Sequence, residues 1–250
     1  MKEWIWGRNP VWEVLKAGRR QVYQLKIARG LEPDQRLGEI LKLAKSRSVS
    51  VTQPPKEELS GIHSHHQGVA LQAGPYPYAE LEEGLQKARS QDEPALVLLL
   101  DTLQDPQNLG SLIRTAELVG VHSVVLPYRR TATVTPAVVS ASSGACEHLL
   151  ITQANLAQTI DRLKEAGLWV VGLEGSPPAQ PPDEIDLTGP LAVVVGSEGE
   201  GMRKLVRESC DFLLRLPMRG QIDSLNAAVA GSVALYLVWQ ARGFLGAAAD

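Results

Sequence analysis

The chain has 250 residues, of which 44% are hydrophobic, so it can bury a substantial core in one large domain or two smaller ones. It lacks both the apolar run of roughly 18 residues that a membrane-spanning helix needs and the apolar core of a signal peptide, so we expect a cytoplasmic protein without a membrane span. Two isolated cysteines exclude a disulfide framework and argue against a metal centre, and a net charge of −3, taken alone, argues against a nucleic-acid binder.

Residues 1–74 are predicted to form a small α/β domain. Strand patterns at 23–28, 48–53 and 68–73 alternate with helical patterns at 11–16 and 34–46. This part carries 12 Lys and Arg against 7 Asp and Glu, whereas the rest of the chain carries 13 against 21. The resulting balances of +5 and −8 fit a polyanion-binding module joined to an acidic body, although a chance imbalance on a solvated surface explains them equally well.

Residues 75–94 are predicted to form a linker. They mix Pro and Gly with a charged stretch, between two apolar patterns. Within them, residues 79–89 have the composition of a short helix. The linker divides the chain into two domains.

Residues 95–250 alternate strands and helices, as a parallel sheet with helices on both faces requires. The run at 95–101 is continuously apolar, which is typical of a strand buried on both faces. Further strands are predicted at 123–127, 168–174, 191–196 and 212–217. Helices are predicted at 108–119, 136–142, 156–166, 203–208 and 224–242.

Two segments place polar residues beyond strand ends, where ligands gather in open α/β sheets. In the first, Asn108 opens a helix and Arg114 follows almost two turns later. Helix capping, by Asp105 or Asn108, and a surface salt bridge for Arg114 explain these residues equally simply. In the second, glycines surround Glu198 at 193–202 and let the backbone approach a ligand closely. This loop matches neither the dinucleotide fingerprint nor the Walker A pattern.

A third segment, GQIDSLN at 220–226, crowds polar groups ahead of the last helix. Asp223, Ser224 and Asn226 surround Leu225 there. Capping of the helix by Ser224 is the simplest explanation, but capping does not require Asn226 as well. The helix that follows is rich in Ala and Gly. It fits a plain core helix, or an unusually close contact within the chain or between subunits.

Together, and in this order, the three segments resemble the signature motifs of one enzyme family. They read N-x-G-x-x-x-R at 108–114, G-S-E-G-x-G at 196–201, and L-P-M followed by S-L-N at 216–218 and 224–226. The pattern is similar to that of the SpoU, or TrmH, family of RNA 2′-O-ribose methyltransferases. The segments at 6–18 and 65–71 resemble its small substrate-binding domain, most closely in the RlmB-like branch, which methylates a guanosine of 23S ribosomal RNA.

The resemblance implies a fold that periodicity alone does not reveal. The second part would be a trefoil-knotted SPOUT α/β domain, the first part a ribosomal-protein-like α/β RNA-binding domain, and the protein a homodimer that pairs partly through its last helix. S-adenosyl-L-methionine would bind in the knot against the backbone of three loops, with no metal. The residues implied to contact this cofactor are Leu173, Glu174, Gly175, Gly196, Gly201, Leu216, Ile222 and Leu225.

The resemblance also implies an active site at the mouth of the knot, made up of Asn108, Arg114, Glu198, Ser224 and Asn226. We expect Arg114 to hold the 3′-phosphate and the developing alkoxide, because a guanidinium with a pKa above about 12 is a poor base. Asn108 would hydrogen-bond near the ribose, and Glu198 would anchor the glycine loop. Three segments far apart in the chain must therefore converge.

Basic side chains are expected to bind RNA phosphates. The candidates are Arg8, Arg19, Arg20, Lys26 and Arg29 in the first part, and Arg129 and Arg130 in the second. His63, His65 and His66 fit RNA contacts or solvated loop positions equally well. The alternatives are a transfer-RNA or antibiotic-resistance ribosomal methylase of the same family, a non-catalytic RNA-binding relative, and a nucleotide-dependent oxidoreductase, which the missing glycine fingerprint weakens.

Overall fold

The computed structural model describes residues 2–222 and 224–247, which fall into two compact units. Unit 1 comprises the chain up to Pro77 together with Val134–His148, and unit 2 comprises Tyr78–Thr133 and the chain from Leu149 onward. The structure therefore divides the chain differently from the prediction. Most of the predicted linker belongs to unit 2, and the return of Val134–His148 to unit 1 was not predicted.

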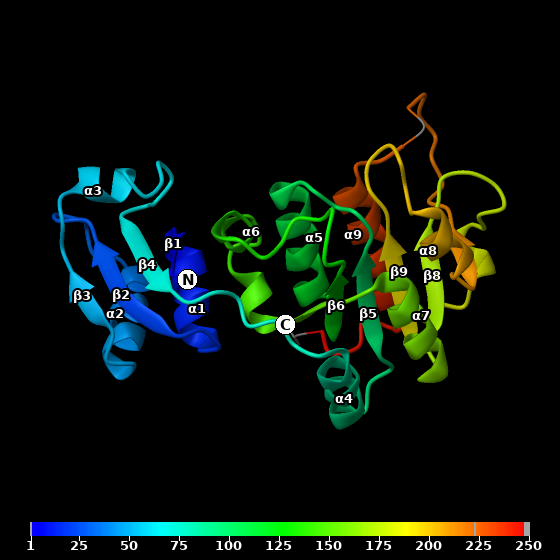
Figure 1. Cartoon of the computed structure of the whole chain (residues 1–250), viewed down its shortest axis with the longest axis horizontal. Coiled ribbons are helices and arrows are strands. Elements are labelled where there is room, and N and C mark those ends of the chain that lie inside the picture. Colours follow the sequence, from blue (N-terminus) through cyan, green and yellow to red (C-terminus); the bar gives the residue numbers. More distant parts are fainter. Residues whose placement is uncertain (1, 223, 248–250) are drawn as a thin grey trace. The chain divides into compact units, whose positions relative to one another are not determined.

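Unit 1 is built on a four-stranded mixed sheet in the order β1-β4-β2-β3 (Figure 1). Its strands are β1 (Glu3–Trp6), β2 (Val22–Ile27), β3 (Ser50–Thr52) and β4 (Val69–Ala73). β4 pairs antiparallel with both β1 and β2, and β3 pairs parallel with β2. The three predicted strands are confirmed, whereas β1 was missed.

Two amphipathic helices, α1 (Arg8–Ala17) and α2 (Gln35–Ser46), which the apolar periodicity predicted, contribute to the core of unit 1. Val11, Leu15 and Ile40 are fully buried on their facing sides. The other helices of this unit are α3 (Lys56–Ser60) and α6 (Pro136–Ala141), followed by the 3-10 helix η1 (Ala145–His148). Of these, α3 and η1 were not predicted.

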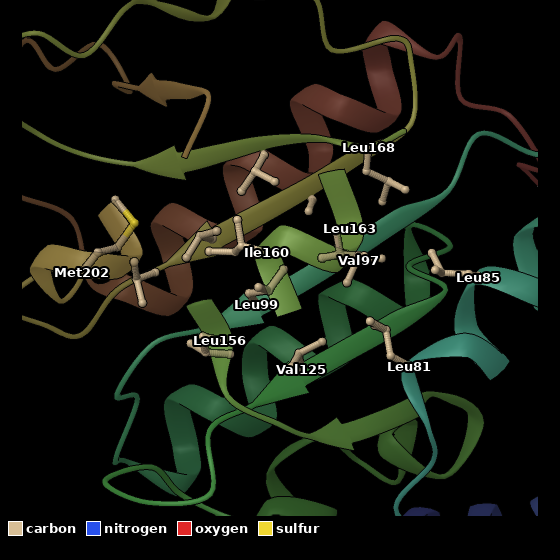
Figure 2. Packing of buried hydrophobic residues seen from close by; sticks show 14 residues of the cluster. Leu81, Leu85, Val97, Leu99, Val125, Leu156, Ile160, Leu163, Leu168 and Met202 are labelled. Carbon is tan, nitrogen blue, oxygen red and sulfur yellow. The ribbon is translucent and has the colours of Figure 1, made fainter. Parts of the chain in front are cut away.

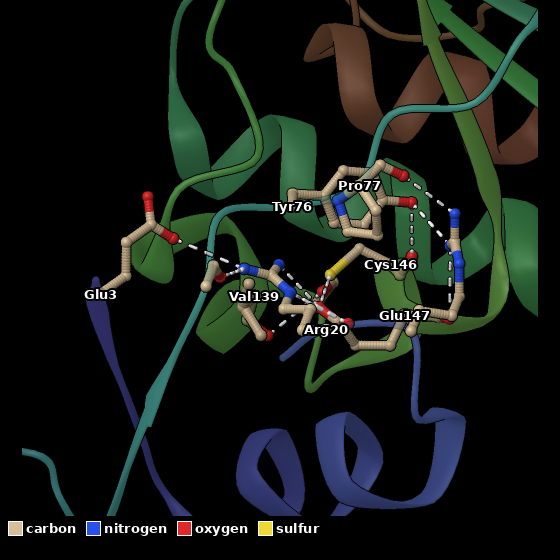
Figure 3. Close-up of polar contacts among 10 residues, drawn as sticks. Glu3, Arg20, Tyr76, Pro77, Val139, Cys146 and Glu147 are labelled. Carbon is tan, nitrogen blue, oxygen red and sulfur yellow. Dashed lines mark hydrogen bonds and ion pairs between the residues drawn. The ribbon is translucent and has the colours of Figure 1, made fainter. Parts of the chain in front are cut away.

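A buried ion pair fastens the segment Val134–His148 to the rest of unit 1 (Figure 3). The side chains of Arg20 and Glu147 are both 0% exposed, and Arg20 Nη2 lies 2.7 Å from Glu147 Oε1. Arg20 Nη1 donates to the carbonyl oxygen of Gly74 at 3.3 Å, and Tyr76 Oη donates to the carbonyl oxygen of Cys146 at 3.0 Å. Burial raises the pKa of the Tyr76 hydroxyl and of the Cys146 thiol.

Unit 2 contains a six-stranded sheet in the order β10-β8-β9-β5-β6-β7, in which every pair is parallel. Its strands are β5 (Leu96–Leu100), β6 (Ser123–Leu126), β7 (Leu150–Gln153), β8 (Trp169–Leu173), β9 (Leu191–Val195) and β10 (Phe212–Leu214). The predicted α/β fold with a parallel sheet is confirmed. The central strand β5 is buried along its whole length, as its continuous apolar sequence predicted, and its neighbour β9 is buried in the same way.

Helices cover both faces of this sheet. They are α4 (Leu81–Gln91), α5 (Pro106–Leu118), α7 (Leu156–Glu165), α8 (Lys204–Glu208) and α9 (Ala227–Ala241). Val97 and Leu99 of β5 point to one face, where they pack with apolar side chains of α4, α7 and α8 (Figure 2). The amphipathic helix α7 contributes Leu156, Ile160 and Leu163 to this cluster, and α4 contributes Leu81 and Leu85.

Helices α5 and α9 pack together, and small residues let α9 approach closely (Figure 1). A Cβ on Gly231 would lie 2.9 Å from Leu112 Cδ1 and 3.0 Å from Val195 Cγ2, so the close contact lies within the chain at this position. Arg242 fixes the far end of α9 by donating to the carbonyl oxygens of Pro94 and Gly189, and its burial lowers the pKa of its guanidinium to about 10. Within the described ranges, no helix is both long and apolar enough to cross a membrane.

Candidate functional site

A cavity of about 730 Å³ lies where β8, β9 and β10 end. Neighbouring parallel strands present their carboxyl ends at one edge of the sheet, which brings together the three segments that follow them. The predicted cofactor residues that line this cavity are Leu173, Glu174, Gly175, Gly196, Gly201, Leu216 and Leu225. Ile222 does not line it and is 77% exposed, so the structure does not support its predicted adenine contact.

Hydrogen bonds join three of the predicted active-site residues beside this cavity. Asn108 Nδ2 donates to Glu198 Oε1 at 2.9 Å, and Asn226 Nδ2 donates to Asn108 Oδ1 at 3.1 Å. Asn226 Nδ2 also donates to Glu198 Oε1. The predicted convergence of three distant segments is therefore present, and Glu198 and Asn226 line the cavity itself.

The helix caps differ from those considered from the sequence. Asn226 caps α9, because its Oδ1 accepts from the backbone N–H groups of Ala228 at 3.0 Å and Val229 at 3.1 Å. Ser224, which the sequence also offered as a cap, does not cap this helix and lines the cavity, whereas Asp223 lies outside the described residues. At α5 the cap is Asp105, which leaves the Asn108 side chain available to Glu198.

The glycine loop after β9 folds tightly back on itself. Ser197 and Gly201 exchange backbone hydrogen bonds of 3.0 and 3.1 Å. A Cβ on Gly196 would lie 2.3 Å from the carbonyl carbon of Gly201, a distance that no side chain can adopt. Gly201 also has a φ of +67°, which favours glycine. At these two glycines the wall of the cavity is therefore formed by backbone atoms, without a side chain.

An ion pair that the sequence analysis missed anchors the end of this loop. Asp101, fully buried at the end of β5, accepts from the backbone N–H of Arg203 at 2.7 Å and from its Nε at 2.7 Å. The available signal was a carboxylate that directly follows a continuously apolar strand, because buried carboxylates need such partners. This contact fixes the start of α8 relative to β5.

Glu174 shapes the part of the cavity wall that follows β8. Its Oε1 accepts from the backbone N–H of Gly175 at 2.9 Å, and its Oε2 accepts from Arg207 Nε at 2.9 Å. Burial alone would raise the pKa of this carboxyl, but the hydrogen bonds from Arg207, Ser176 and Gly175 outweigh it and lower the pKa. Glu174 is therefore a carboxylate at neutral pH and closes the turn after β8.

Arg114 is exposed on α5, where its position follows from helical geometry. Six residues separate it from Asn108, so the two side chains leave the helix about 120° apart. Arg114 does not line the cavity in the described part of the chain. Its catalytic role stays a prediction.

The predicted RNA contacts in unit 1 need correction. Arg20 is buried in its ion pair with Glu147, so it cannot reach a phosphate, and the prediction for it is wrong. Arg19 is half-buried and donates to the carbonyl oxygen of Pro77 at 3.1 Å, so its guanidinium is also engaged inside the protein. Lys26 pairs with Glu58 at 2.7 Å.

Other predicted RNA contacts remain accessible. Arg29 is exposed, and Arg8 is partly exposed and pairs with Asp34. Arg129 and Arg130 are both exposed after β6 in unit 2. No cluster of three His, Cys, Asp or Glu side chains among the described residues is arranged to hold a metal ion.

Comparisons with known proteins agree with this geometry. The sequence model of the SpoU rRNA Methylase family matches residues 95–236, and a model described as RNA 2′-O ribose methyltransferase substrate binding matches residues 4–79. The chain is 41% identical over 246 residues to YacO of Bacillus subtilis (strain 168), named as a candidate TrmH family tRNA/rRNA methyltransferase, with 98% of each protein covered.

Solved structures share the fold. The SpoU methyltransferase AviRb from Streptomyces viridochromogenes, in complex with AdoMet, has a TM-score of 0.79 at 22% identity, covering 97% of this chain and 91% of AviRb. An AdoMet-bound rRNA methyltransferase from Sinorhizobium meliloti has a TM-score of 0.77 at 23% identity, covering 98% and 88%. At these identities the likeness concerns the fold.

Proposed function

The chain belongs to the SpoU rRNA methylase family, and from this premise we propose that it transfers a methyl group from S-adenosyl-L-methionine to a ribose 2′-hydroxyl of RNA. The observation that carries the proposal is the hydrogen-bonded triangle of Asn108, Glu198 and Asn226 beside the cavity at the strand ends. We propose a guanosine of 23S ribosomal RNA as the target.

The cavity suits S-adenosyl-L-methionine in size and chemistry. Its volume, about 730 Å³, falls within the roughly 300–1,000 Å³ typical of ligand sites. Leu173, Leu216 and Leu225 offer apolar surface to an adenine, and Glu174 and Glu198 offer negative charge to a cationic ligand. The tight fold at Gly196 lets the ligand approach the backbone closely. When bound, this cofactor supplies an electrophilic methyl group on a sulfonium.

The protein's own part in the reaction is positioning and electrostatics. Well-oriented reactants gain on the order of 7–11 kcal/mol over free encounter, and the triangle holds its three side chains in one arrangement by charge-assisted hydrogen bonds. We propose that Arg114 stabilises the alkoxide that develops at the 2′-oxygen and holds the 3′-phosphate. Proton removal is left to phosphate or water, because Arg is an obligate donor.

We also propose three further features on the basis of family membership: the knot, RNA binding by unit 1 and the homodimer. We propose that the cavity lies in a trefoil knot, which the placement of β10 beside β8 supports, because the chain must cross back after β9. We also propose that unit 1 binds RNA and that the protein is a homodimer. Leu118 on α5 and Val229, Val233 and Tyr236 on α9 are exposed apolar residues that fit such pairing. The cytoplasmic location stays a prediction.

The test offers radiolabelled S-adenosyl-L-methionine to unmodified 23S ribosomal RNA and to transfer RNA in separate reactions. We expect label in 23S RNA as a 2′-O-methyl group, located by resistance of the adjacent phosphodiester to alkali. Label in transfer RNA alone would move the proposal to the transfer-RNA branch of the family. Calorimetric failure to bind S-adenosylhomocysteine, with no label in either RNA, would favour a non-catalytic RNA-binding protein.

A further inference from the structure

A second cavity, of about 980 Å³, lies in unit 1 and has no part in the methyl transfer described above. Segments 8–9, 28–32 and 64–68 form its wall, together with Arg36 and Lys56. Its size is at the upper end of the roughly 300–1,000 Å³ typical of ligand sites. Four cationic side chains line it, against one carboxylate, that of Glu32. The cavity is therefore suited to an anion.

Two of the four cations are available to a ligand. Arg29 and Lys56 are exposed, and neither forms an ion pair within the described ranges. The other two are held in place by partly exposed pairs: Arg8 by Asp34, and Arg36 by Glu39. Partly exposed pairs contribute little stability, so a phosphate can replace either carboxylate at small cost.

A short series of aromatic rings ends at the same cavity. The rings of Trp6 and His63 are stacked, with centroids 4.1 Å apart and planes inclined by 12°. His65, which lines the cavity, has its ring centroid 5.5 Å from that of His63, and its backbone N–H donates to His63 Nδ1 at 3.1 Å. An exposed ring backed by a stacked pair is the kind of surface on which an unpaired base stacks.

The loop that carries His65 is fixed from within. His66 is 2% exposed, and its Nδ1 accepts from the backbone N–H of Gly68 at 2.8 Å. Gln67 Oε1 accepts from the backbone N–H of Arg8 at 2.9 Å, which ties the loop to the start of α1. Gln67 and Asn9 both line the cavity, so their side-chain amides can hydrogen-bond a base edge there.

We propose that this cavity receives an unpaired nucleotide of the RNA substrate, with its base against His65 and the flanking phosphates on Arg29 and Lys56. A base inside a duplex is stacked on its neighbours and cannot reach His65, so the site selects a loop or bulge over a continuous helix. The proposal rests on the proposed function, because it takes RNA as the ligand. It adds a structural criterion by which unit 1 chooses its target.

The test measures binding of full-length protein, with S-adenosylhomocysteine present, to a fluorescein-labelled RNA hairpin and to the same strand annealed to its full complement. Fluorescence anisotropy is recorded over a range of salt concentrations. The variants are R29A/K56A, His65→Ala and His65→Phe. The matched control is K42A/K45A, which removes the same charge from exposed positions of α2 outside the cavity.

Salt dependence is measured as the slope of the logarithm of the binding constant against the logarithm of the salt concentration. We expect R29A/K56A to lower the magnitude of this slope for the hairpin by about 1.4, since each phosphate contact on a single strand contributes about 0.7. The control variant should leave the slope unchanged. His65→Ala should weaken hairpin binding about 5- to 150-fold, the range that loss of one base stack gives, with little effect on the duplex. His65→Phe keeps a ring and should restore binding.

Equal losses for hairpin and duplex, or no loss with His65→Ala, would overturn the proposal and leave a plain basic surface. Competition by inorganic phosphate as effective as that by the hairpin would also overturn it, because it would show a free-anion site. Methyl transfer by the wild-type protein is measured in parallel. Absence of transfer with the expected binding pattern would overturn the proposed function alone, whereas transfer without that pattern would overturn only the nucleotide site.

Discussion

The amide of Asn226 serves two structural purposes at once. Its oxygen caps α9 and its nitrogen donates to Glu198 and Asn108, which lie 28 and 118 positions away in the chain. The Asn226 side chain therefore fixes both the start of α9 and part of the wall of the candidate site. The two purposes use different atoms, so they can be separated by substitution.

Asn226→Asp and Asn226→Ala should separate capping from the site. Asp keeps the capping oxygen but loses the donor and places a second carboxylate beside Glu198, so we expect the melting temperature to change little and methyl transfer to fall strongly. Ala removes the cap as well and should cost about 0.5–2 kcal/mol of stability. Thermal unfolding and single-turnover transfer measure the two effects. Equal stability of both variants would contradict the capping role.

Gly196→Ala should abolish cofactor binding. The added Cβ would lie 2.3 Å from the carbonyl carbon of Gly201 and 2.4 Å from the backbone nitrogen of Met202, so the loop must move away from the cavity. Overpacking of this kind costs about 1–3 kcal/mol. The control is Gly189→Ala, where a Cβ meets nothing within 4 Å. Calorimetry with S-adenosylhomocysteine should show binding by the control and none by Gly196→Ala.

Arg114→Ala should separate chemistry from cofactor affinity. If the guanidinium stabilises the developing alkoxide, its loss should slow transfer about 10²- to 10³-fold, the size of effect seen when one such donor is removed. Affinity for S-adenosylhomocysteine should stay the same, because Arg114 does not line the cavity in the described structure. Arg162→Ala, an exposed arginine on α7, is the control. Undiminished turnover of Arg114→Ala would refute its assignment.

Among the elements of unit 2, β6 is directly preceded by a buried histidine. His122 is 2% exposed, and its Nδ1 accepts from the backbone N–H of Leu96 at the start of β5. Burial lowers the pKa of His122, and Lys87 and Arg242 act in the same direction. Glu93, whose Oε2 lies 3.4 Å from Nε2, opposes this shift without reversing it.

The stability of wild-type protein should therefore fall as the pH drops below about 6.5, the ordinary pKa of histidine. Below that pH the unfolded chain takes up a proton at His122 while the folded chain does not, so the unfolded state is favoured until the pH reaches the lowered pKa. His122→Asn keeps an acceptor for Leu96 and cannot titrate. Urea midpoints measured from about pH 8 to pH 5 should fall less steeply in this variant; parallel curves would rule out the assignment.

Most helices and strands could be predicted from strong local sequence patterns. The order of the strands could not, because it depends on pairing between distant segments. The apolar runs of β5 and β9 and the periodicity of α7 each decide one element from adjacent residues. β1 and β7 were missed: each has only four residues, and neither is as uniformly apolar and buried as β6, a strand of the same length that was predicted. The sheet order depends on which strands meet, and no single segment carries that information.

The candidate site, too, could be predicted only in part from the sequence. The motifs predicted that Asn108, Glu198 and Asn226 converge, because a family resemblance carries three-dimensional information that periodicity lacks. The cap was placed on Ser224 and not on Asn226, because either residue type caps well and the two lie only two positions apart. Arg20 was misread because a basic residue in a basic domain is usually exposed, and its partner Glu147 is 127 positions away.

At the scale of the whole molecule, the chain passes between its two units three times, after Pro77, after Thr133 and before Leu149. The excursion Val134–His148 supplies unit 1 with Glu147, the closer of the two carboxylates that pair with Arg20. A fragment that ends at the predicted domain boundary, residue 74, would lose Glu147 and leave the buried guanidinium only the longer 3.4 Å contact between its Nη1 and Glu3 Oε2. Unit 1 is therefore not complete in the sequence of its first 77 residues.

Arg20→Met alone should destabilise the protein by about 3–5 kcal/mol, because Glu147 would remain buried without its counter-ion. Arg20→Met with Glu147→Leu should recover most of that loss, since apolar side chains of similar volume can replace a buried pair. Arg89→Met breaks the exposed pair with Glu82 and should cost at most about 1 kcal/mol. Urea unfolding gives these energies, and hydrogen exchange at 134–148 locates the effect. Protection lost there in the single variant and regained in the double variant would show that this ion pair holds the excursion in unit 1; equal losses in both would mean that the charge itself is required.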